Sequence, residues 1–159
     1  VVNAVYNQAN MVLVVLDNST TAMTGHQPHP GTGRTVMGEI VQKINIEQVL
    51  RGIGVTDIET INPLELEASV SCVKRMAEKS GVRAIIFKAP CIAVTKPKAP
   101  LHVDQDSCIG CKKCIRDLGC PAIVMNDGKI CIDASMCTGC HLCSQVCPVC
   151  AIAGGDDHE

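Results

Sequence analysis

Cys108-Ile-Gly-Cys111-Lys-Lys-Cys114 and Cys137-Thr-Gly-Cys140-His-Leu-Cys143 are two copies of one pattern, placed twenty-nine residues apart. Each copy is followed by one more cysteine directly before proline, in Cys120-Pro121 and Cys147-Pro148. Three thiols at this spacing with a remote fourth are typical of bacterial ferredoxins with two [4Fe–4S] clusters, in which the remote cysteine binds the cluster of the other run. We therefore expect two electron-carrying clusters, with the ligand sets Cys108, Cys111, Cys114 with Cys147, and Cys137, Cys140, Cys143 with Cys120.

Zinc and disulfide bonds explain these cysteines less well. A zinc ribbon needs two Cys-x₂-Cys pairs, so four of the eight cysteines would be enough for it. Disulfide frameworks suit small secreted domains, whereas this sequence shows neither a secretory leader nor an apolar stretch long enough to span a membrane. One position departs from the pattern, because five residues separate Cys114 from Cys120, against three between Cys143 and Cys147.

Four further cysteines lie outside these two sets. A free cysteine usually packs as a small buried hydrophobic residue, and we expect that role for all four. Cys131 falls in an alternating segment, residues 129–133, which predicts a strand between the cluster loops. Cys150 lies close to a cluster and is the candidate substitute ligand, while Cys72 falls in a helical stretch and Cys91 follows a strand.

The composition limits the size and the partners of the protein. Its 159 residues suit one or two small domains. A net charge near −2 does not favour nucleic acid or an anionic membrane as a partner. Twelve cysteines without secretory features indicate a reducing cytoplasm. The chain begins with Val1 rather than Met, so we expect a piece of a longer protein.

Lys96-Pro-Lys-Ala-Pro100 is the clearest boundary, because proline continues neither a helix nor a central strand. We expect a first domain over residues 1–95, a linker over 96–100 and a small α+β domain of the two-cluster ferredoxin type over 101–159. In the first domain, apolar runs separated by a helix predict part of an α/β fold with a parallel sheet. The predicted strands are residues 11–16, covered on both faces, 57–61 and 83–88.

The helix is expected between the second and third of these strands. Asn62 and Pro63 suit its N-cap and first turn, and its end is expected near Ser80-Gly81. One apolar stripe should face the sheet, and it comprises Leu66, Val70, Val73 and Ala77.

Polar residues follow the first predicted strand, at the edge where an open parallel sheet binds its ligands. Taken alone, Asp17-Asn18-Ser19-Thr20 is an Asx turn. Together with Gly25-His26-Gln27-Pro28-His29-Pro30-Gly31-Thr32-Gly33, it resembles the thiamine-diphosphate domain of the 2-oxoacid:ferredoxin oxidoreductases. The resemblance covers essentially the whole chain and is nearest to the members that act on indolepyruvate.

The resemblance implies how the cofactor is held. In that family a Gly-Asp-Gly-like turn opens the motif and an Asn closes it; Asn18 matches the Asn, and the opening turn would precede Val1. Mg²⁺ prefers oxygen ligands and takes several from phosphates, so the implied ligands are the diphosphate, the Asp carboxylate of the opening turn, the Asn18 amide oxygen and the Thr20 carbonyl. His26 and His29 lie in the same loop, and each is as suited to a structural role as to a role in binding or catalysis. The implied cofactor-binding residues are Asn18, Thr20, Met23, Thr24, Gly25 and His26.

By resemblance, the parent enzyme oxidatively decarboxylates an aryl 2-oxo acid with CoA to an acyl-CoA and CO₂, and its clusters reduce an external ferredoxin. A beta subunit is the implied partner, no catalytic residue is assigned here, and this chain alone is expected to be inactive. Two alternatives stay open: an oxidoreductase for pyruvate or a branched 2-oxo acid, and a non-catalytic electron-transfer protein. The basic residues of the first cluster loop either steer an acidic acceptor or form a solvated face; they are Lys112, Lys113 and Arg116.

Overall fold

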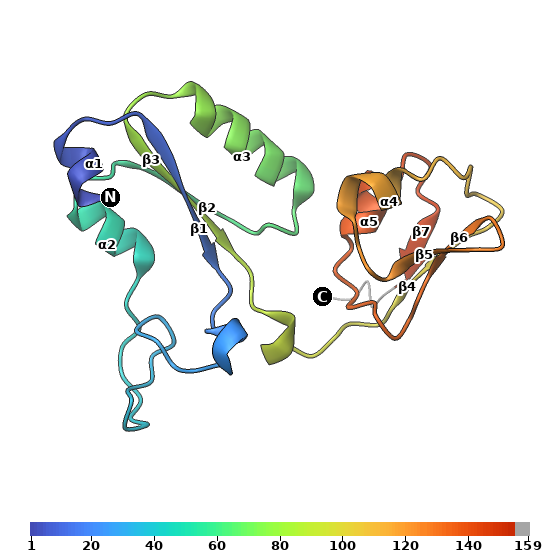
Figure 1. Cartoon of the computed structure of the whole chain (residues 1–159), viewed down its shortest axis with the longest axis horizontal. Coiled ribbons are helices and arrows are strands. Elements are labelled where there is room, and N and C mark those ends of the chain that lie inside the picture. The colour runs from blue at the N-terminus through green and yellow to red at the C-terminus, as the bar shows by residue number, and fades with distance from the viewer. Residues whose placement is uncertain (155–159) are drawn as a thin grey trace. The chain divides into compact units, whose positions relative to one another are not determined.

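The computed structural model describes residues 1–154, and the chain divides into two compact units, Val1–Thr95 and Lys96–Glu159 (Figure 1). The elements of the first unit are α1 (Val2–Tyr6), β1 (Met11–Asp17), η1 (Ala22–Thr24), α2 (Ile46–Gly52), β2 (Asp57–Ile61), α3 (Leu66–Glu78), β3 (Val82–Lys88) and η2 (Ile92–Val94). Those of the second are β4 (Leu101–Val103), α4 (Lys113–Leu118), β5 (Ile123–Asn126), β6 (Lys129–Ile132), α5 (Leu142–Val146) and β7 (Ile152–Gly154). Among residues 1–154, no helix has the length and apolar character needed to cross a bilayer.

The first unit is built on a parallel sheet with the strand order β1-β3-β2. This confirms the predicted α/β fold and its three strands. The expectation that β1 is covered on both faces is wrong, because Val14 and Leu16 are 49% and 76% exposed. The reason is that α3 packs mainly against β2 and β3. The strand buried on both faces is instead the central one, β3, in which Ala84, Ile85 and Ile86 are buried.

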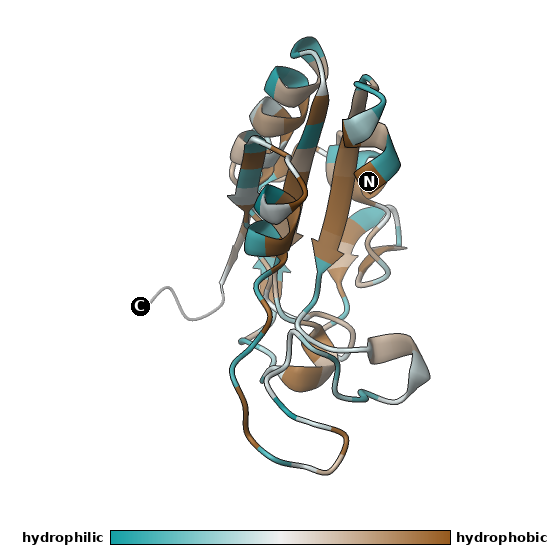
Figure 2. Cartoon of the chain, turned by 90° about the vertical axis from the view of Figure 1, so that its left-hand side faces the viewer, coloured by the Kyte–Doolittle hydropathy of each residue, from teal (hydrophilic) through white to brown (hydrophobic). Residues whose placement is uncertain are grey.

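Helices cover both faces of this sheet. On one face, Cys72 and Met76 of α3 form a fully buried cluster with Ile85 of β3. On the other face, Leu50 of α2 packs in a second cluster with Ile86. Figure 2 shows the apolar strands, in brown, between these helices. Neighbouring residues of β3 therefore serve opposite cores, as the alternation of side chains along a strand requires.

The face of α3 that packs on the sheet differs from the predicted stripe. The buried residues of the helix are Ser69, Cys72 and Met76, whereas Val70 and Val73 are 44% and 45% exposed. The stripe of Leu66, Val70, Val73 and Ala77 is therefore wrong as the core-facing side, and within it only Leu66 is even half-buried. The buried face was hard to predict from the sequence, because it combines the small side chains of Ser69 and Cys72 with a single long apolar one, Met76.

The two ends of α3 also differ from the expected ones. The helix starts at Leu66 with Glu65 as N-cap, so Asn62 and Pro63 precede it. Asn62 closes a turn instead: its Oδ1 accepts from the Leu64 N–H (3.1 Å) and its carbonyl from the Glu65 N–H (3.1 Å). The helix ends at Glu78, within three residues of the predicted Ser80-Gly81.

Arg83 holds the C-terminal end of α3 against the sheet. The residue is only 4% exposed although it carries a full charge. Its Nε donates to the Met76 carbonyl oxygen (3.0 Å), and its Nη1 donates to the Gly81 carbonyl oxygen (2.6 Å) and to Asn10 Oδ1. The last carbonyl oxygens of a helix lack hydrogen-bond partners within the helix. The buried guanidinium, which has five N–H donors, therefore bonds to these and other neutral oxygens and not to a carboxylate.

The second unit is a small α+β fold, as predicted. β4 pairs with β7 and β5 with β6, both antiparallel, and α4 packs with α5. The strand expected over residues 129–133 is β6.

The twenty-nine-residue repeat of the sequence is also a repeat of the backbone. The Cys108 N–H donates to the Asp104 carbonyl oxygen (3.0 Å), and the Cys137 N–H donates to the Asp133 carbonyl oxygen (3.1 Å). Each aspartate closes a turn with its own side chain, because Oδ1 accepts from the main-chain N–H two residues on (3.0 and 2.9 Å). These hydrogen bonds hold the entry to each cysteine loop in the same conformation.

Candidate functional site

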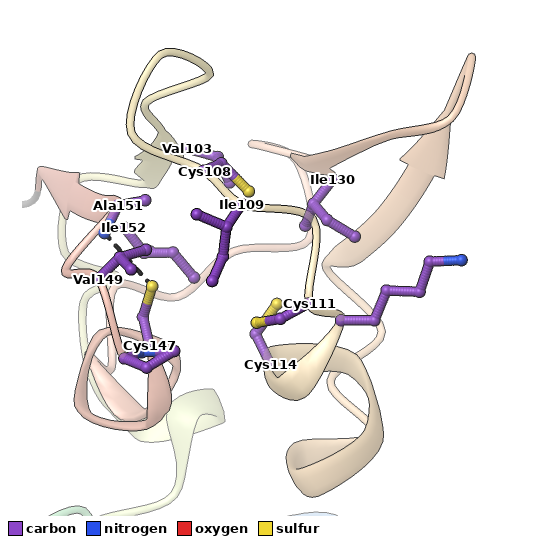
Figure 3. A pocket seen from close by; sticks show the side chains of 12 residues that line it. Val103, Cys108, Ile109, Cys111, Cys114, Ile130, Cys147, Val149, Ala151 and Ile152 are labelled. Carbon is purple, nitrogen blue, oxygen red and sulfur yellow. Dashed lines mark hydrogen bonds between the residues drawn. The ribbon is translucent and has the colours of Figure 1, made fainter.

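Four cysteines from both runs surround one cavity of the second unit (Figure 3). Cys108 and Cys111 come from the first loop, Cys114 from the first turn of α4, and Cys147 from the end of α5. The remaining lining is mostly apolar and includes Val103, Ile109, Ile130, Val149, Ala151 and Ile152. The structure therefore groups the thiols of the first predicted ligand set, including the one from the second run.

The second predicted set is also drawn together. The pKa of the Cys143 thiol is raised to about 11, mainly by burial and in smaller part by the nearby Cys140, Cys137 and Cys120. Burial likewise raises the pKa of Cys114, with smaller contributions from Cys111 and Cys147. Each buried thiol thus lies within electrostatic range of its own run and of the remote cysteine of the other run.

The unusual spacing before Cys120 has a structural explanation. α4 has six residues and ends in Gly119, whereas α5 has five and ends directly in Cys147. Gly119 adopts the left-handed conformation (φ 57°) that glycine tolerates best. The longer helix and the additional cap residue take up the two extra positions, so Cys120 still lies near the second set.

The chemistry of this donor set fits four-iron clusters. Within residues 1–154 no three Cys, His, Asp or Glu side chains converge as they would around a single ion. The thiols of the first set instead border a cavity, as ligands that each serve a different iron of a cubane must. Two main-chain N–H groups donate to cysteine sulfurs, from Ala151 to Cys147 Sγ (3.3 Å) and from Leu101 to Cys137 Sγ (3.5 Å). Such hydrogen bonds stabilise thiolate ligands and tune the cluster potential.

The four other cysteines differ in exposure. Cys72 is fully buried, which confirms the expected packing role. Cys91 and Cys131 are half-buried. Cys150 is exposed, so the expectation of a buried residue is wrong there. Its backbone is left-handed (φ 52°), and its N–H donates to the Cys147 carbonyl oxygen (3.3 Å), which closes a turn before β7.

In the first unit, the residues after β1 form two consecutive Asx turns. Asp17 Oδ1 accepts from the Ser19 N–H (3.0 Å), and Asn18 Oδ1 accepts from the Thr20 N–H (3.2 Å). The Asn18 carbonyl oxygen also accepts from the Cys91 N–H (2.9 Å), which ties the ends of β1 and β3 together. Asn18 lies in a cleft of about 270 Å³ at the carboxyl ends of the strands, with Ser69 among the other lining residues.

Oxygen atoms suited to Mg²⁺ are present at this turn. The Asn18 amide oxygen keeps a second lone pair beside its bond to Thr20. No backbone N–H of residues 1–154 donates to the Thr20 carbonyl oxygen. A hard cation with phosphate ligands needs donors of this type, so these two residues fit part of a magnesium site.

The other predicted cofactor residues do not line the cleft that contains Asn18. Met23 is fully exposed and Thr24 Oγ1 donates to Gln27 Oε1 (2.6 Å). With Gly25 and His26 they form an exposed turn that lines neither cleft at the strand ends. The part of Met23, Thr24, Gly25 and His26 in holding the cofactor stays a prediction.

His29 does reach a cleft, on the other face of the sheet. This cleft of about 440 Å³ is also lined by Asp17, Lys43 and Lys88. His29 Nδ1 accepts from the Gly31 N–H (3.1 Å), so a neutral ring carries its proton on Nε2. The sequence analysis did not identify Lys88 as a residue of this cleft. Its Nζ lies 3.8 Å from Asp17 Oδ2. Lys88 ends a predicted strand, and that position could have indicated it.

Comparison with known proteins assigns both units. Residues 1–87 match the family described as thiamine pyrophosphate enzyme, C-terminal TPP binding domain. Residues 101–148 match the 4Fe-4S dicluster domain. No solved structure matches the chain.

Three curated relatives carry the name indolepyruvate oxidoreductase subunit IorA. The chain is 45% identical to that of Methanothermobacter thermautotrophicus over 153 residues, 40% identical to that of Archaeoglobus fulgidus over 157, and 37% identical to that of Pyrococcus abyssi over 156. These alignments cover 95%, 95% and 92% of this chain but 25%, 25% and 24% of the relatives. The chain thus spans about a quarter of the length of the curated relatives it matches.

Proposed function

Because this chain belongs to the thiamine pyrophosphate enzymes through its C-terminal TPP binding domain, we propose that it forms part of a 2-oxoacid:ferredoxin oxidoreductase. The parent enzyme converts an aryl 2-oxo acid such as indolepyruvate, with CoA, to an acyl-CoA and CO₂. The electrons leave through two [4Fe–4S] clusters to an external ferredoxin in a reducing cytoplasm, and a beta subunit completes the enzyme.

One observation carries this proposal: a TPP binding domain and a dicluster domain follow each other in a single chain. Thiamine diphosphate, when bound, supplies an electron sink for cleavage next to a carbonyl group. Decarboxylation alone needs no electron carrier, whereas oxidation of the remaining fragment releases two electrons. A pair of one-electron clusters is the expected way to remove them.

In the proposed enzyme, Asn18 and Thr20 hold the magnesium ion of the cofactor. Their oxygens lie at the carboxyl end of β1, and the hydrogen bond from Cys91 fixes this end beside β3. Ser69 borders the same cleft from α3. These residues position the diphosphate, and the rest of the cofactor is held outside this chain.

The eight cysteines hold the clusters in the crossed sets given above. The apolar lining of the first cavity, from Val103 to Ile152, limits water around the sulfurs. The N–H donors of Leu101 and Ala151 offset part of the thiolate charge. Burial and hydrogen bonding are the features by which a protein sets the potential of such clusters.

The aryl preference comes from the relatives, whose names specify indolepyruvate. The test uses the complete enzyme, purified without oxygen and supplied with CoA and indolepyruvate, phenylpyruvate or pyruvate. Acyl-CoA formation and reduction of a viologen dye are measured for each acid. We expect indolepyruvate to have the highest kcat/KM. A preference for pyruvate would refute the assignment of an aryl substrate. If the enzyme converted none of the three acids, the proposed oxidoreductase activity would be refuted.

A further inference from the structure

A basic patch lies on the first cluster loop, formed by Lys112, Lys113 and Arg116. All three side chains belong to exposed residues at the start and the last turn of α4. Within residues 1–154, none of them forms an ion pair. Lys112 also borders the cavity lined by the first cysteine set. The charges therefore face solvent beside the proposed first cluster.

The second half of the repeat shows that the loop does not need these charges to fold. The residues at the equivalent positions are His141, Leu142 and Gln145. Lys112 and His141 have nearly the same left-handed backbone, with φ of 59° and 61°, and each is the N-cap of its helix. Two loops of one conformation thus differ in charge, so the charges serve something other than the local fold.

The patch is local and does not reflect a basic domain. Residues 96–159 contain six Lys and Arg but eight Asp and Glu. Segment 108–118 carries three basic residues and only Asp117 as an acid, whereas segment 137–147 carries neither Lys, Arg, Asp nor Glu. Of these two segments, only the first therefore carries basic side chains, and Lys98 lies beside the second loop, where its N–H donates to the Thr138 carbonyl oxygen (3.2 Å).

The first site is also the more accessible of the two. Cys111 is exposed, whereas its counterpart Cys140 is half-buried. Ile109 is 65% exposed beside it, and the equivalent residue of the second loop is the polar Thr138. An apolar contact next to positive charges has the composition of a docking site for an acidic protein, in which charge guides the encounter and apolar contact excludes water.

We infer that an acidic electron-carrier protein docks on the basic patch and Ile109, so that electrons leave this chain from the first cysteine set. The carrier is reduced by one electron in each encounter while the first cluster is oxidised by one. The inference rests on the proposed function for the source of these electrons, but the docking itself is measured without any 2-oxo acid.

The test compares two double variants of the complete enzyme. Lys113→Glu with Arg116→Glu reverses two charges of the patch, and neither residue lines the cavity. Lys74→Glu with Lys96→Glu makes the same change in charge at exposed residues that belong to neither cluster loop. Iron content and the EPR signal of the reduced clusters establish that each variant keeps both clusters. Lys113→Gln with Arg116→Gln serves if the reversal disturbs them.

Each enzyme is reduced with dithionite, freed of the excess, and mixed with an oxidised acidic ferredoxin in a stopped-flow instrument. Changing the patch should lower the association rate constant about tenfold at low salt and flatten its salt dependence. The control pair should match the unchanged enzyme. With cytochrome c, a basic acceptor, the patch variant should react faster.

Identical rates and salt slopes for the patch and control variants would overturn the inference. Viologen reduction driven by the 2-oxo acid tests the proposed function separately. Loss of that reaction with the salt effect intact would leave the docking site standing.

Discussion

Among the single residues, the buried cysteines differ in whether other thiols lie near them. Cys72 is buried among apolar side chains, and burial raises its thiol pKa, with a further rise from its hydrogen bond to Glu59. Cys114 and Cys143 are also buried, but each lies near other thiols. A raised pKa keeps a lone thiol protonated and inert, whereas a group of thiols loses its protons when it binds metal.

Replacement of single cysteines tests the ligand sets. The reconstituted chain should bind about eight irons as two cubanes. Cys111→Ser or Cys140→Ser should remove or convert one cluster, while Cys131→Ser and Cys72→Ser should leave the iron content unchanged. Iron analysis and EPR after anaerobic reconstitution measure both effects. Stoichiometric zinc in place of iron would contradict the cluster assignment, and iron loss in Cys131→Ser would contradict the ligand sets.

Asn18→Ala tests the proposed magnesium site in the complete enzyme. The substitution removes an oxygen ligand, so it should weaken retention of thiamine diphosphate and lower CoA-dependent turnover by about ten- to a hundredfold or more. The clusters should keep their spectrum and their reduction by dithionite, because their ligands lie in the other unit. Ser19→Ala is the matched control, since the Ser19 side chain is exposed and makes no hydrogen bond within residues 1–154. Full activity of Asn18→Ala would refute the site.

Among the elements, α3 shows that the size of the side chains, and not only their hydrophobicity, decides which face of a helix packs on the sheet. Its buried row of Ser69, Cys72 and Met76 fits closely over β3, while the β-branched Val70 and Val73 stay half-exposed. Small side chains allow a helix to approach a sheet, and interiors are close-packed. The Arg83 hydrogen bonds then fix the end of this helix.

A pair of alanine substitutions distinguishes the two rows of α3. Met76→Ala removes a side chain with no exposed surface, so it should cost about 2–5 kcal/mol of unfolding free energy. Val73→Ala should change it by less than about 1 kcal/mol, since half-exposed helix positions contribute little. Urea unfolding followed by far-UV circular dichroism gives both values. Equal losses would mean that α3 packs on the sheet through the predicted apolar row.

The repeat offers a second matched pair, Gly110 and Gly139. Both have positive φ (65° and 68°), so alanine strains either backbone alike. A Cβ at Gly139 would lie 2.7 Å from the Ala99 carbonyl oxygen, whereas a Cβ at Gly110 meets open space. Gly139→Ala should therefore lose the second cluster on reconstitution more readily than Gly110→Ala loses the first. Equal iron contents in the two variants would count against this contact.

At the scale of the whole molecule, the two units divide the proposed work. The first unit, Val1–Thr95, holds the clefts at the carboxyl ends of its sheet, and the second, Lys96–Glu159, holds all eight cysteines of the two sets. Each unit has its own apolar contacts. We thus assign cofactor binding to the first unit and electron transfer to the second.

This division predicts the behaviour of the 159-residue chain on its own. It should take up both clusters, because every proposed ligand lies within residues 108–147. It should not turn over indolepyruvate, phenylpyruvate or pyruvate, because Asn18 and Thr20 supply only part of a cofactor site. Absorbance near the cluster bands and dye reduction measure the two properties. Turnover by the isolated chain would contradict the assignment of the remaining cofactor contacts to other parts of the enzyme.

Local features of this protein were predictable from its sequence. Cysteine spacing is a property of a short loop, so the sequence predicted the two sets, and the fold places the four thiols of the first set around one cavity. The ligand sets themselves stay a prediction. The three strands and the parallel sheet followed from apolar runs with a helix between. The left-handed Gly119 explains why even the irregular spacing before Cys120 does not disrupt the pattern.

Features that depend on contacts between distant segments are visible only in the folded chain. The central place of β3, the exposed face of β1 and the buried row of α3 follow from how the helices fit on the sheet. The resemblance groups Asn18 with residues 23–26, whereas in the fold Asn18 lines a cleft at the strand ends and residues 23–26 form an exposed turn. The exposure of Cys150 and of the basic patch likewise depends on the packing of α4, α5 and their neighbours. The spacing of a motif involves only residues close together in the sequence. The burial of a residue depends on segments far from it in the sequence, so a local motif does not predict it.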